Sequence, residues 1–187
     1  MCTRCKWVDT SKPDYVEYHD KEWGVPVYDD TVFFEFLILE SAQAGLSWYT
    51  ILKRREGYRN AFSNFDPQIV SKFDYVKVDE LMNNTGIIRN RAKIEAAINN
   101  AQRFLDIQNQ HGSFSNFIWG YVDGQSLDTR NGHEMSPATT PLSDTVAKDL
   151  KQIGFKFLGS TTIYAFLQAT GVVNDHDLDC CCRLAGG

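Results

Sequence analysis

The sequence lacks a long, uninterrupted hydrophobic run, which excludes a helix that crosses a bilayer. Its longest apolar stretches, Val32 to Leu39 and Ile163 to Leu167, are too short and too interrupted for the roughly 20 residues that a membrane span needs. The first residues turn polar at once, so no export signal is expected either. We therefore expect no membrane contact and a cytoplasmic location.

The chain also lacks an excess of positive charge. It has 19 Lys and Arg residues against 24 Asp and Glu residues, a net charge of -5 at pH 7. This balance excludes a protein that coats nucleic acid through cationic charge alone. DNA binding by a local basic run such as Lys53-Arg54-Arg55 stays open, although such a run is more often a solvated helix face.

Sustained alternation of polar and apolar residues is absent, and the apolar residues instead recur at helical spacing. One example is the face formed by Ile94, Ala97, Ala101 and Phe104. We expect helices over residues 31–44, 48–62, 66–72, 79–85, 89–110, 143–153 and 159–169, and an irregular surface loop over 123–141. With no repeat and no linker, the pattern predicts an all-α fold in which residues 1–187 form a single unit.

The few cysteines are placed unevenly, with Cys2 and Cys5 near the start and Cys180, Cys181 and Cys182 near the end. An odd number of thiols in a reducing compartment favours metal ligands over a disulfide framework. Two thiolates and two imidazoles would complete a tetrahedral, structural zinc site with no open position. We expect one Zn²⁺ per chain held by Cys5, His19, His176 and Cys180, with the other three cysteines as non-ligands; buried thiols and hydrogen-bonded histidines are the alternative.

Residues 150–162 are expected to form the end of one helix, a tight turn that closes at Gly159, and the start of the next helix. Backbone N–H groups at the start of a helix can bind a DNA phosphate. A purely structural turn is the alternative, and Gly86-Ile87-Ile88-Arg89 is a second candidate with similar chemistry.

Aromatic residues gather near carboxylates in the first part of the chain, where Trp7, Tyr15, Tyr18, Trp23 and Trp48 accompany Glu40. Aromatic faces together with an acid suit a flipped, positively charged base such as an alkylated purine. Core packing is the alternative for any single aromatic residue.

A set of motifs follows one another through nearly the whole chain. They are Cys5-Lys6-Trp7, the run from Tyr18 to Pro26, Leu39-Glu40, the run from Gln43 to Trp48, Gly86-Ile87-Ile88-Arg89, Gly154-Phe155-Lys156-Phe157, and Asn174-Asp175-His176 with Cys180-Cys181-Cys182. Together they resemble the bacterial 3-methyladenine DNA glycosylase I family. The sequence departs from the expected pattern at Ser41-Ala42, where Gly-Gln is more usual, and at Asp179, where Gly is expected.

This resemblance implies a helix-hairpin-helix DNA glycosylase fold whose termini are joined by the zinc site at Cys5, His19, His176 and Cys180. It also implies an enzyme that flips 3-methyladenine out of double-stranded DNA and hydrolyses the N-glycosidic bond. The products would be an abasic site and free 3-methyladenine. Thr161 stands where bifunctional relatives carry a lysine nucleophile, so we expect no strand cleavage, and we expect a monomer.

The resemblance further assigns individual roles. Glu40 is expected to bind the extruded base as the catalytic residue, Tyr18 to contact it and Trp48 to stack on it, with Trp7, Tyr15 and Trp23 lining the pocket. Gly45 and Leu46 would enter the gap left in the base stack. Lys156, Gly159, Ser160 and Thr161 would hold the DNA backbone, and no catalytic role is assigned to Asp175, Asp177 or Asp179.

Two other functions fit parts of the pattern. A DNA-binding module without enzymatic activity would use zinc only to fasten its ends. A zinc hydrolase or deaminase would need an exchangeable position on the metal for an activated water.

Overall fold

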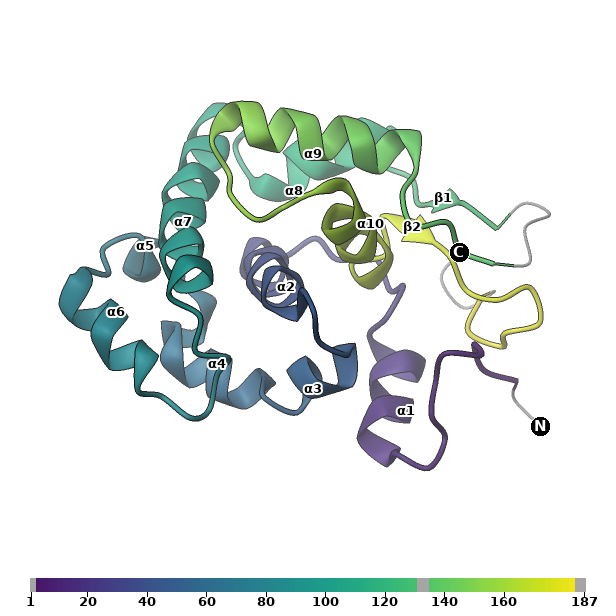
Figure 1. Cartoon of the computed structure of the whole chain (residues 1–187). Helices are drawn as coiled ribbons and strands as arrows, with labels where there is room; N and C mark the ends of the chain where they lie inside the picture. The colour runs from purple at the N-terminus through teal and green to yellow at the C-terminus, as the bar shows by residue number, and fades with distance from the viewer. Residues whose placement is uncertain (1–2, 131–134, 184–187) are drawn as a thin grey trace.

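The computed structural model describes residues 3–130 and 135–183, and helices dominate these residues (Figure 1). The helices are α1 (Pro13–Lys21), α2 (Asp30–Gln43), α3 (Trp48–Leu52), α4 (Arg55–Ala61), α5 (Pro67–Val70), α6 (Tyr75–Met82), α7 (Arg91–His111), α8 (Phe114–Trp119), α9 (Pro141–Ile153) and α10 (Ser160–Ala169). Short 3-10 turns cover Ser63–Phe65 and Gly120–Val122, and two strands, β1 (Leu127–Asp128) and β2 (Val173–Asn174), pair in parallel. No helix in the described ranges is both long enough and apolar enough to cross a membrane.

Helix α2 forms the centre of the molecule, between α7 and α10 (Figure 1). The Asp29 carboxylate caps its start by accepting from the backbone N–H groups of Thr31 and Val32. Every residue from Phe33 to Ala42 is buried. A helix that is apolar on all sides can be stable only inside a core. Glu40 is therefore carried into the interior by the helix on which it lies.

Helix α7 is the longest helix and packs against α2, α5, α6 and α8. The Asn90 side chain caps its start, and Gly112, at φ +81°, ends it. Helix α9 begins with a capping box formed by Thr140 and Ser143 and ends at the left-handed Gly154. A turn over residues 154–159 then leads into α10, which packs on α9 and α2.

The structure corrects several expectations. The single helix expected over 48–62 is wrong, because the backbone leaves helical geometry at Arg54 (ψ 2°), which separates α3 from α4. Short α1 and α8 were not expected from the pattern. The expected absence of strands is also wrong for the pair β1–β2, whose two-residue strands are too short to show alternation, and β1 interrupts the predicted loop over 123–141.

The first and last described segments lie side by side, as the purple and yellow ribbons in Figure 1 show. The Cys181 N–H donates to the Thr3 carbonyl over 2.9 Å, and the Lys6 N–H donates to the Asp177 carboxylate over 2.7 Å. Residues more than 170 positions apart in the sequence therefore form one local structure.

Candidate functional site

A cavity of about 230 Å³ opens between α1, the C-terminal end of α2, the start of α3 and α10. It is lined by Trp7, Tyr15, Tyr18, Trp23, Glu40, Gln43, Trp48, Ser136, Ala165 and Gln168. The structure thus brings together all six residues predicted to bind the base. Aromatic rings with one carboxyl group dominate the lining, as a site for a flat, polar ligand requires.

Four polar atoms in this lining are buried and have no hydrogen-bond partner among the described residues: Trp7 Nε1, Tyr18 OH, Glu40 Oε2 and Trp48 Nε1. A buried polar atom without a partner costs about 1–3 kcal/mol, and native proteins contain few of them. Four such atoms around one cavity indicate a site built to bind a ligand that supplies the missing partners.

Glu40 lies in the last turn of α2 and is 4% exposed. Burial disfavours the ionised carboxylate and raises the pKa of Glu40 to about 8. Burial raises the pKa of the neighbouring Tyr18 hydroxyl as well, with a smaller effect from the Glu40 charge. A cationic ligand would stabilise the ionised Glu40, so the cavity favours positive charge.

Two aromatic rings pack against the Trp48 ring. It lies 5.7 Å from the Tyr18 ring and 6.4 Å from the nearly parallel Phe36 ring, measured between centroids. Arg55 covers Phe36 at 5.5 Å and pairs with buried Glu35 and with Glu22. Trp48 therefore has a rigid support and can offer its ring to a planar ligand.

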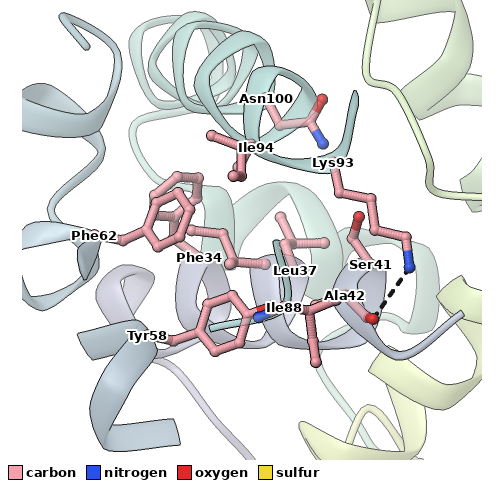
Figure 2. A pocket seen from close by; sticks show the side chains of 12 residues that line it. Phe34, Leu37, Ser41, Ala42, Tyr58, Phe62, Ile88, Lys93, Ile94 and Asn100 are labelled. Atoms are coloured by element: carbon pink, nitrogen blue, oxygen red, sulfur yellow. Dashed lines mark hydrogen bonds between the residues drawn. The ribbon is translucent and has the colours of Figure 1, made fainter. Parts of the chain in front are cut away.

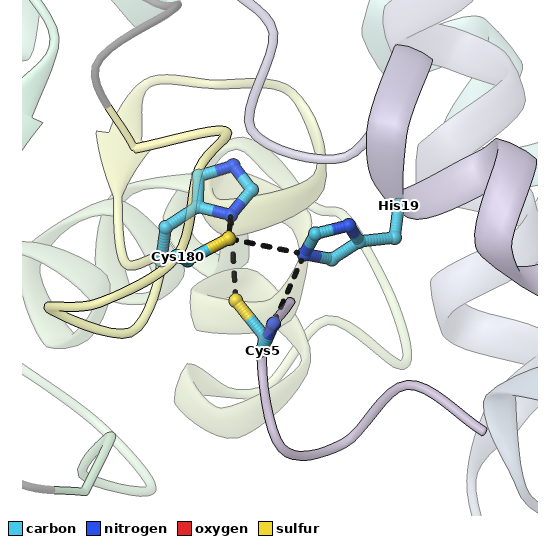
Figure 3. A group of neighbouring side chains, drawn as sticks. Cys5, His19 and Cys180 are labelled. Carbon is cyan, nitrogen blue, oxygen red and sulfur yellow. Dashed lines mark hydrogen bonds between the residues drawn. The ribbon is translucent and has the colours of Figure 1, made fainter. Parts of the chain in front are cut away.

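Next to this cavity, the side chains of Cys5, His19, His176 and Cys180 converge, and all four are buried. Figure 3 shows Cys5, His19 and Cys180 pointing toward one another from three separate segments. The Cys180 Sγ atom lies 3.5 Å from His19 Nε2 and 3.5 Å from His176 Nδ1, and Cys5 Sγ lies 3.4 Å from His176 Nδ1. Neighbouring ligand atoms of a tetrahedral zinc ion are about 3.3–3.8 Å apart, so this group could hold a metal ion.

The surroundings of the four side chains suit metal ligation. Asp20 Oδ1 lies 2.8 Å from His19 Nδ1 and orients the other ring nitrogen toward the cluster. Burial lowers the pKa of His176 to about 4, which keeps the imidazole neutral as a ligand must be. Burial raises the pKa of the Cys5 thiol, so a thiolate here requires a cation beside it.

Of the predicted non-ligands, Cys182 forms part of a second, less buried group with His19 and Asp20. Its Sγ atom is 4.0 Å from His19 Nδ1, the nitrogen that already faces Asp20, so it does not belong to the four-residue cluster. Cys2 lies outside the described residues.

Comparison with known proteins agrees with this geometry. A sequence model of the methyladenine glycosylase family matches residues 7–183. The DNA-3-methyladenine glycosylase of Haemophilus influenzae is 45% identical, over 98% of this chain and 99% of its own length. The chain belongs to the methyladenine glycosylase family. The predicted family and enzyme class are confirmed at this level.

Solved structures of related proteins have the same fold. A crystal structure of 3-methyladenine DNA glycosylase I superposes with a TM-score of 0.91 at 48% identity, covering 96% of this chain and 99% of the other. A Staphylococcus aureus 3-methyladenine DNA glycosylase I, solved to explain 3-methyladenine recognition, has a TM-score of 0.89 at 43% identity, with 93% of each chain covered. The mainly helical fold of the methyladenine glycosylase family is therefore confirmed for this chain.

In this family member, several predicted DNA contacts gather beside the aromatic cavity. Gly45, Leu46 and Thr161 line an adjoining hollow together with Glu40 and Gln43. Gly45 and Leu46 are exposed, at the turn between α2 and α3. The wedge predicted at Gly45 and Leu46 thus lies at the edge of the base cavity.

The remaining predicted DNA contacts lie in the turn before α10. Lys156 and Gly159 are exposed, and a side chain placed on Gly159 would meet no atom within 4 Å, so the backbone there is open to a partner. Ser160 Oγ instead contacts Ser143 and the Asp144 carboxylate. The alternative turn at Gly86 lines a different groove with Lys53 and Arg54, away from the aromatic cavity.

Sequence reasoning did not name Gln43, Ser136, Ala165 and Gln168 as pocket residues in this glycosylase. Gln168 donates to the Asp175 carboxylate over 2.6 Å, and Arg130 pairs with Asp175 and with Asp177. Both aspartates are buried in these contacts, and Asp179 is exposed. The i, i+3 spacing of Ala165 and Gln168 on α10 was the available signal.

Proposed function

We propose that this protein hydrolyses the N-glycosidic bond of 3-methyladenine in double-stranded DNA, after flipping the base into the aromatic cavity. The observation that carries the proposal is the set of four buried, unpartnered polar atoms in one aromatic lining. The Staphylococcus aureus relative is described as a 3-methyladenine-recognising enzyme, which supports the same ligand here.

The chemistry follows from the charge of the substrate. In DNA, 3-methyladenine is a cationic ring and therefore already a good leaving group, so selective binding of the cation can supply much of the rate. Trp48 would stack on the ring, while Glu40 and Tyr18 would accept or donate hydrogen bonds at its edge. Trp7, Tyr15 and Trp23 would close the cavity around it.

We propose that the enzyme is monofunctional. The described lining of the cavity contains no lysine amine that could form a Schiff base with the sugar. The family resemblance also predicts Thr161 where bifunctional relatives carry a lysine, which supports the same proposal. Gly45 with Leu46 would fill the space of the flipped base, and the turn before α10, with Lys156, Gly159, Ser160 and Thr161, would hold the backbone in a helix-hairpin-helix arrangement.

We further propose that Cys5, His19, His176 and Cys180 bind one structural Zn²⁺. When bound, zinc supplies a crosslink between the two ends of the chain. Four buried protein ligands leave no coordination position for an activated water, which argues against the zinc hydrolase alternative. One folded unit over residues 1–187, a monomeric state and a cytoplasmic location remain predictions.

The deciding experiment incubates the purified, zinc-loaded protein with methylated duplex DNA and measures released 3-methyladenine. Wild type should release it and leave intact abasic strands, with no borohydride-trapped protein–DNA adduct. Glu40→Gln should slow release roughly a hundredfold, because glutamine cannot ionise to balance the positive charge of the bound base. Glu80→Gln, an exposed carboxylate on α6, is the matched control and should match wild type. DNA binding without base release by the wild type would favour the non-enzymatic module instead.

A further inference from the structure

The turn between α2 and α3 connects the base cavity to the predicted wedge. Helix α2 ends at Gln43, and its last turn contains no basic residue. Gly45 follows with φ +80°, and the Leu46 N–H donates to the Gln43 carbonyl over 2.7 Å. The backbone carbonyls at the end of a helix need other donors. The remaining carbonyls are therefore available to donors from outside α2.

Lys93, in the first turn of α7, supplies those donors. Its Nζ atom donates to the Ala42 carbonyl over 3.1 Å and to the Ala44 carbonyl over 3.2 Å. Figure 2 shows the side chain reaching across to Ala42 past Ser41. The two partners are 51 and 49 positions away in the sequence. Lys93 thus ties the turn to a different helix.

The space beneath this contact is closed. The cavity that Lys93 shares with Phe34, Leu37 and Ile94 has a volume of about 20 Å³, room for about one water molecule. It is too small for a ligand, and the unusual pair Ser41-Ala42 faces it rather than the base cavity. The Lys93 ammonium therefore acts on the backbone of the turn and not on a bound molecule.

The charge of Lys93 suits its position. The C-terminal end of a helix carries partial negative charge, and a cation placed there stabilises it. Glu40 and Gln43 lie in the last turn of the same helix, and Leu46 follows directly. A displaced turn would therefore move the wedge relative to the cavity.

We propose that Lys93 is a positioning residue for base extrusion, holding the Ala44-Gly45-Leu46 turn where the wedge enters the stack as the base enters the cavity. This inference rests on the proposed function, because it assumes that the turn meets DNA. It predicts a loss in base release from duplex DNA with no loss in affinity for the free base, since Lys93 is absent from the lining of the base cavity.

The test compares Lys93→Met, which keeps the length of the side chain, with Lys93→Arg, which keeps the charge and the donors. Lys77→Met, which removes a half-buried lysine on α6 that pairs with Glu80 outside both cavities, is the control. Three quantities are measured for each: the single-turnover release rate from methylated duplex, the Kd for free 3-methyladenine from tryptophan fluorescence, and the melting temperature. Lys93→Met should release base roughly 10- to 100-fold more slowly with an unchanged Kd. Lys93→Arg should recover most of the rate.

The inference is overturned if Lys93→Met releases base at the wild-type rate, or if its Kd for the free base weakens in step with the rate, as a general loss of folding would produce. If Lys93→Met does not fold, Lys93→Gln is judged by the same two criteria. Wild type without any base release would refute the proposed function itself, whereas active wild type with an unaffected Lys93→Met would refute only the role of Lys93.

Discussion

At the scale of single residues, Glu40 is the side chain whose burial has the clearest chemical purpose. An apolar helix carries it inside, and its Oε2 atom has no protein partner among the described residues. In the free protein, burial of this carboxyl favours its neutral, protonated form, because its pKa is raised to about 8. Binding a cationic base would then release a proton.

The Glu40 pKa predicts how stability depends on pH. Because its pKa rises from an ordinary value of 4.5 to about 8, the folded protein keeps a proton that the unfolded chain loses between these values. The free energy of unfolding should therefore fall as pH increases from about 4.5 to about 8, and this contribution should be absent from Glu40→Gln. The free energy of unfolding is measured by urea denaturation for wild type and Glu40→Gln across this pH range. The difference between the two proteins isolates the contribution of Glu40, because the contributions of the other titrating groups cancel. A pH-independent difference would mean that the carboxyl is ionised in the folded protein.

Gly24 is a second residue whose identity the structure requires. Its φ is +79°, and a Cβ atom there would lie 2.7 Å from Nε2 of His176. Gly124 has a similar φ of +75°, but a Cβ atom there would meet no atom within 4 Å. Gly124→Ala is therefore the control, since it adds only backbone strain, which costs about 1 kcal/mol. We expect Gly24→Ala to lower the melting temperature more than Gly124→Ala and to weaken zinc retention. Equal effects in the two variants would show that the His176 contact tolerates a methyl group.

At the scale of elements, α7 organises both turns that are proposed to meet DNA. Lys93 binds the α2–α3 turn, and two helical turns later Asn100 binds the α9–α10 turn. The Asn100 amide donates to the Lys156 carbonyl over 2.9 Å and accepts from the Lys156 N–H over 2.8 Å. A single helix thereby sets the spacing between the predicted wedge and the predicted phosphate site.

Replacing Asn100 should separate DNA binding from base binding. Asn100→Leu leaves two backbone groups of Lys156 unpaired, so we expect affinity for an abasic-site duplex to fall about tenfold, or about 1.4 kcal/mol. Affinity for free 3-methyladenine should not change. Asn116→Leu, which removes an exposed amide on α8, is the control for both measurements. Unchanged duplex affinity in Asn100→Leu would place the phosphate contact on another surface.

Prediction of helices from the sequence succeeded where residues within or next to the helix determine where it begins and ends. The cap at Asp29 and the periodicity of α7 lie within a few residues and are visible in the pattern. The break between α3 and α4 lies next to Arg55, which pairs with Glu22, just after α1, and with Glu35 of α2, so its surroundings come from distant parts of the chain. Strands of two residues, such as Leu127–Asp128, are stabilised only by a partner far along the chain.

At the scale of the whole molecule, the cluster of Cys5, His19, His176 and Cys180 joins the ends of the chain to the cavity. Trp7 contacts the His19 ring at 5.3 Å, and Trp23 contacts the His176 ring at 4.7 Å. Both indoles also line the base cavity. Periodicity could not reveal this arrangement, because the residues come from opposite ends of the chain. The cysteine and histidine placement and the family resemblance suggested the four candidate ligands and the lining residues, whereas the contacts between the two groups, and Gln43 and Gln168, needed the structure.

Metal removal should therefore affect more than stability. We expect His176→Ala to lose the stoichiometric zinc that wild type retains, and chelated wild type to melt at lower temperature and to bind free 3-methyladenine more weakly. Elemental analysis, thermal unfolding and base titration test this. Full zinc content in His176→Ala would remove that residue from the ligand set. Undiminished base affinity after complete chelation would show that the two sites are independent.

The shared indoles also have a practical consequence. The fluorescence of Trp7 and Trp23 should change both when a base binds in the cavity and when zinc binds to the cluster. Intrinsic tryptophan fluorescence can therefore report either binding event. A quenching curve recorded on partly loaded material would mix the two signals. Titrations at fixed, saturating zinc would yield the true base affinity, and titrations of zinc at fixed base would measure how strongly each event assists the other.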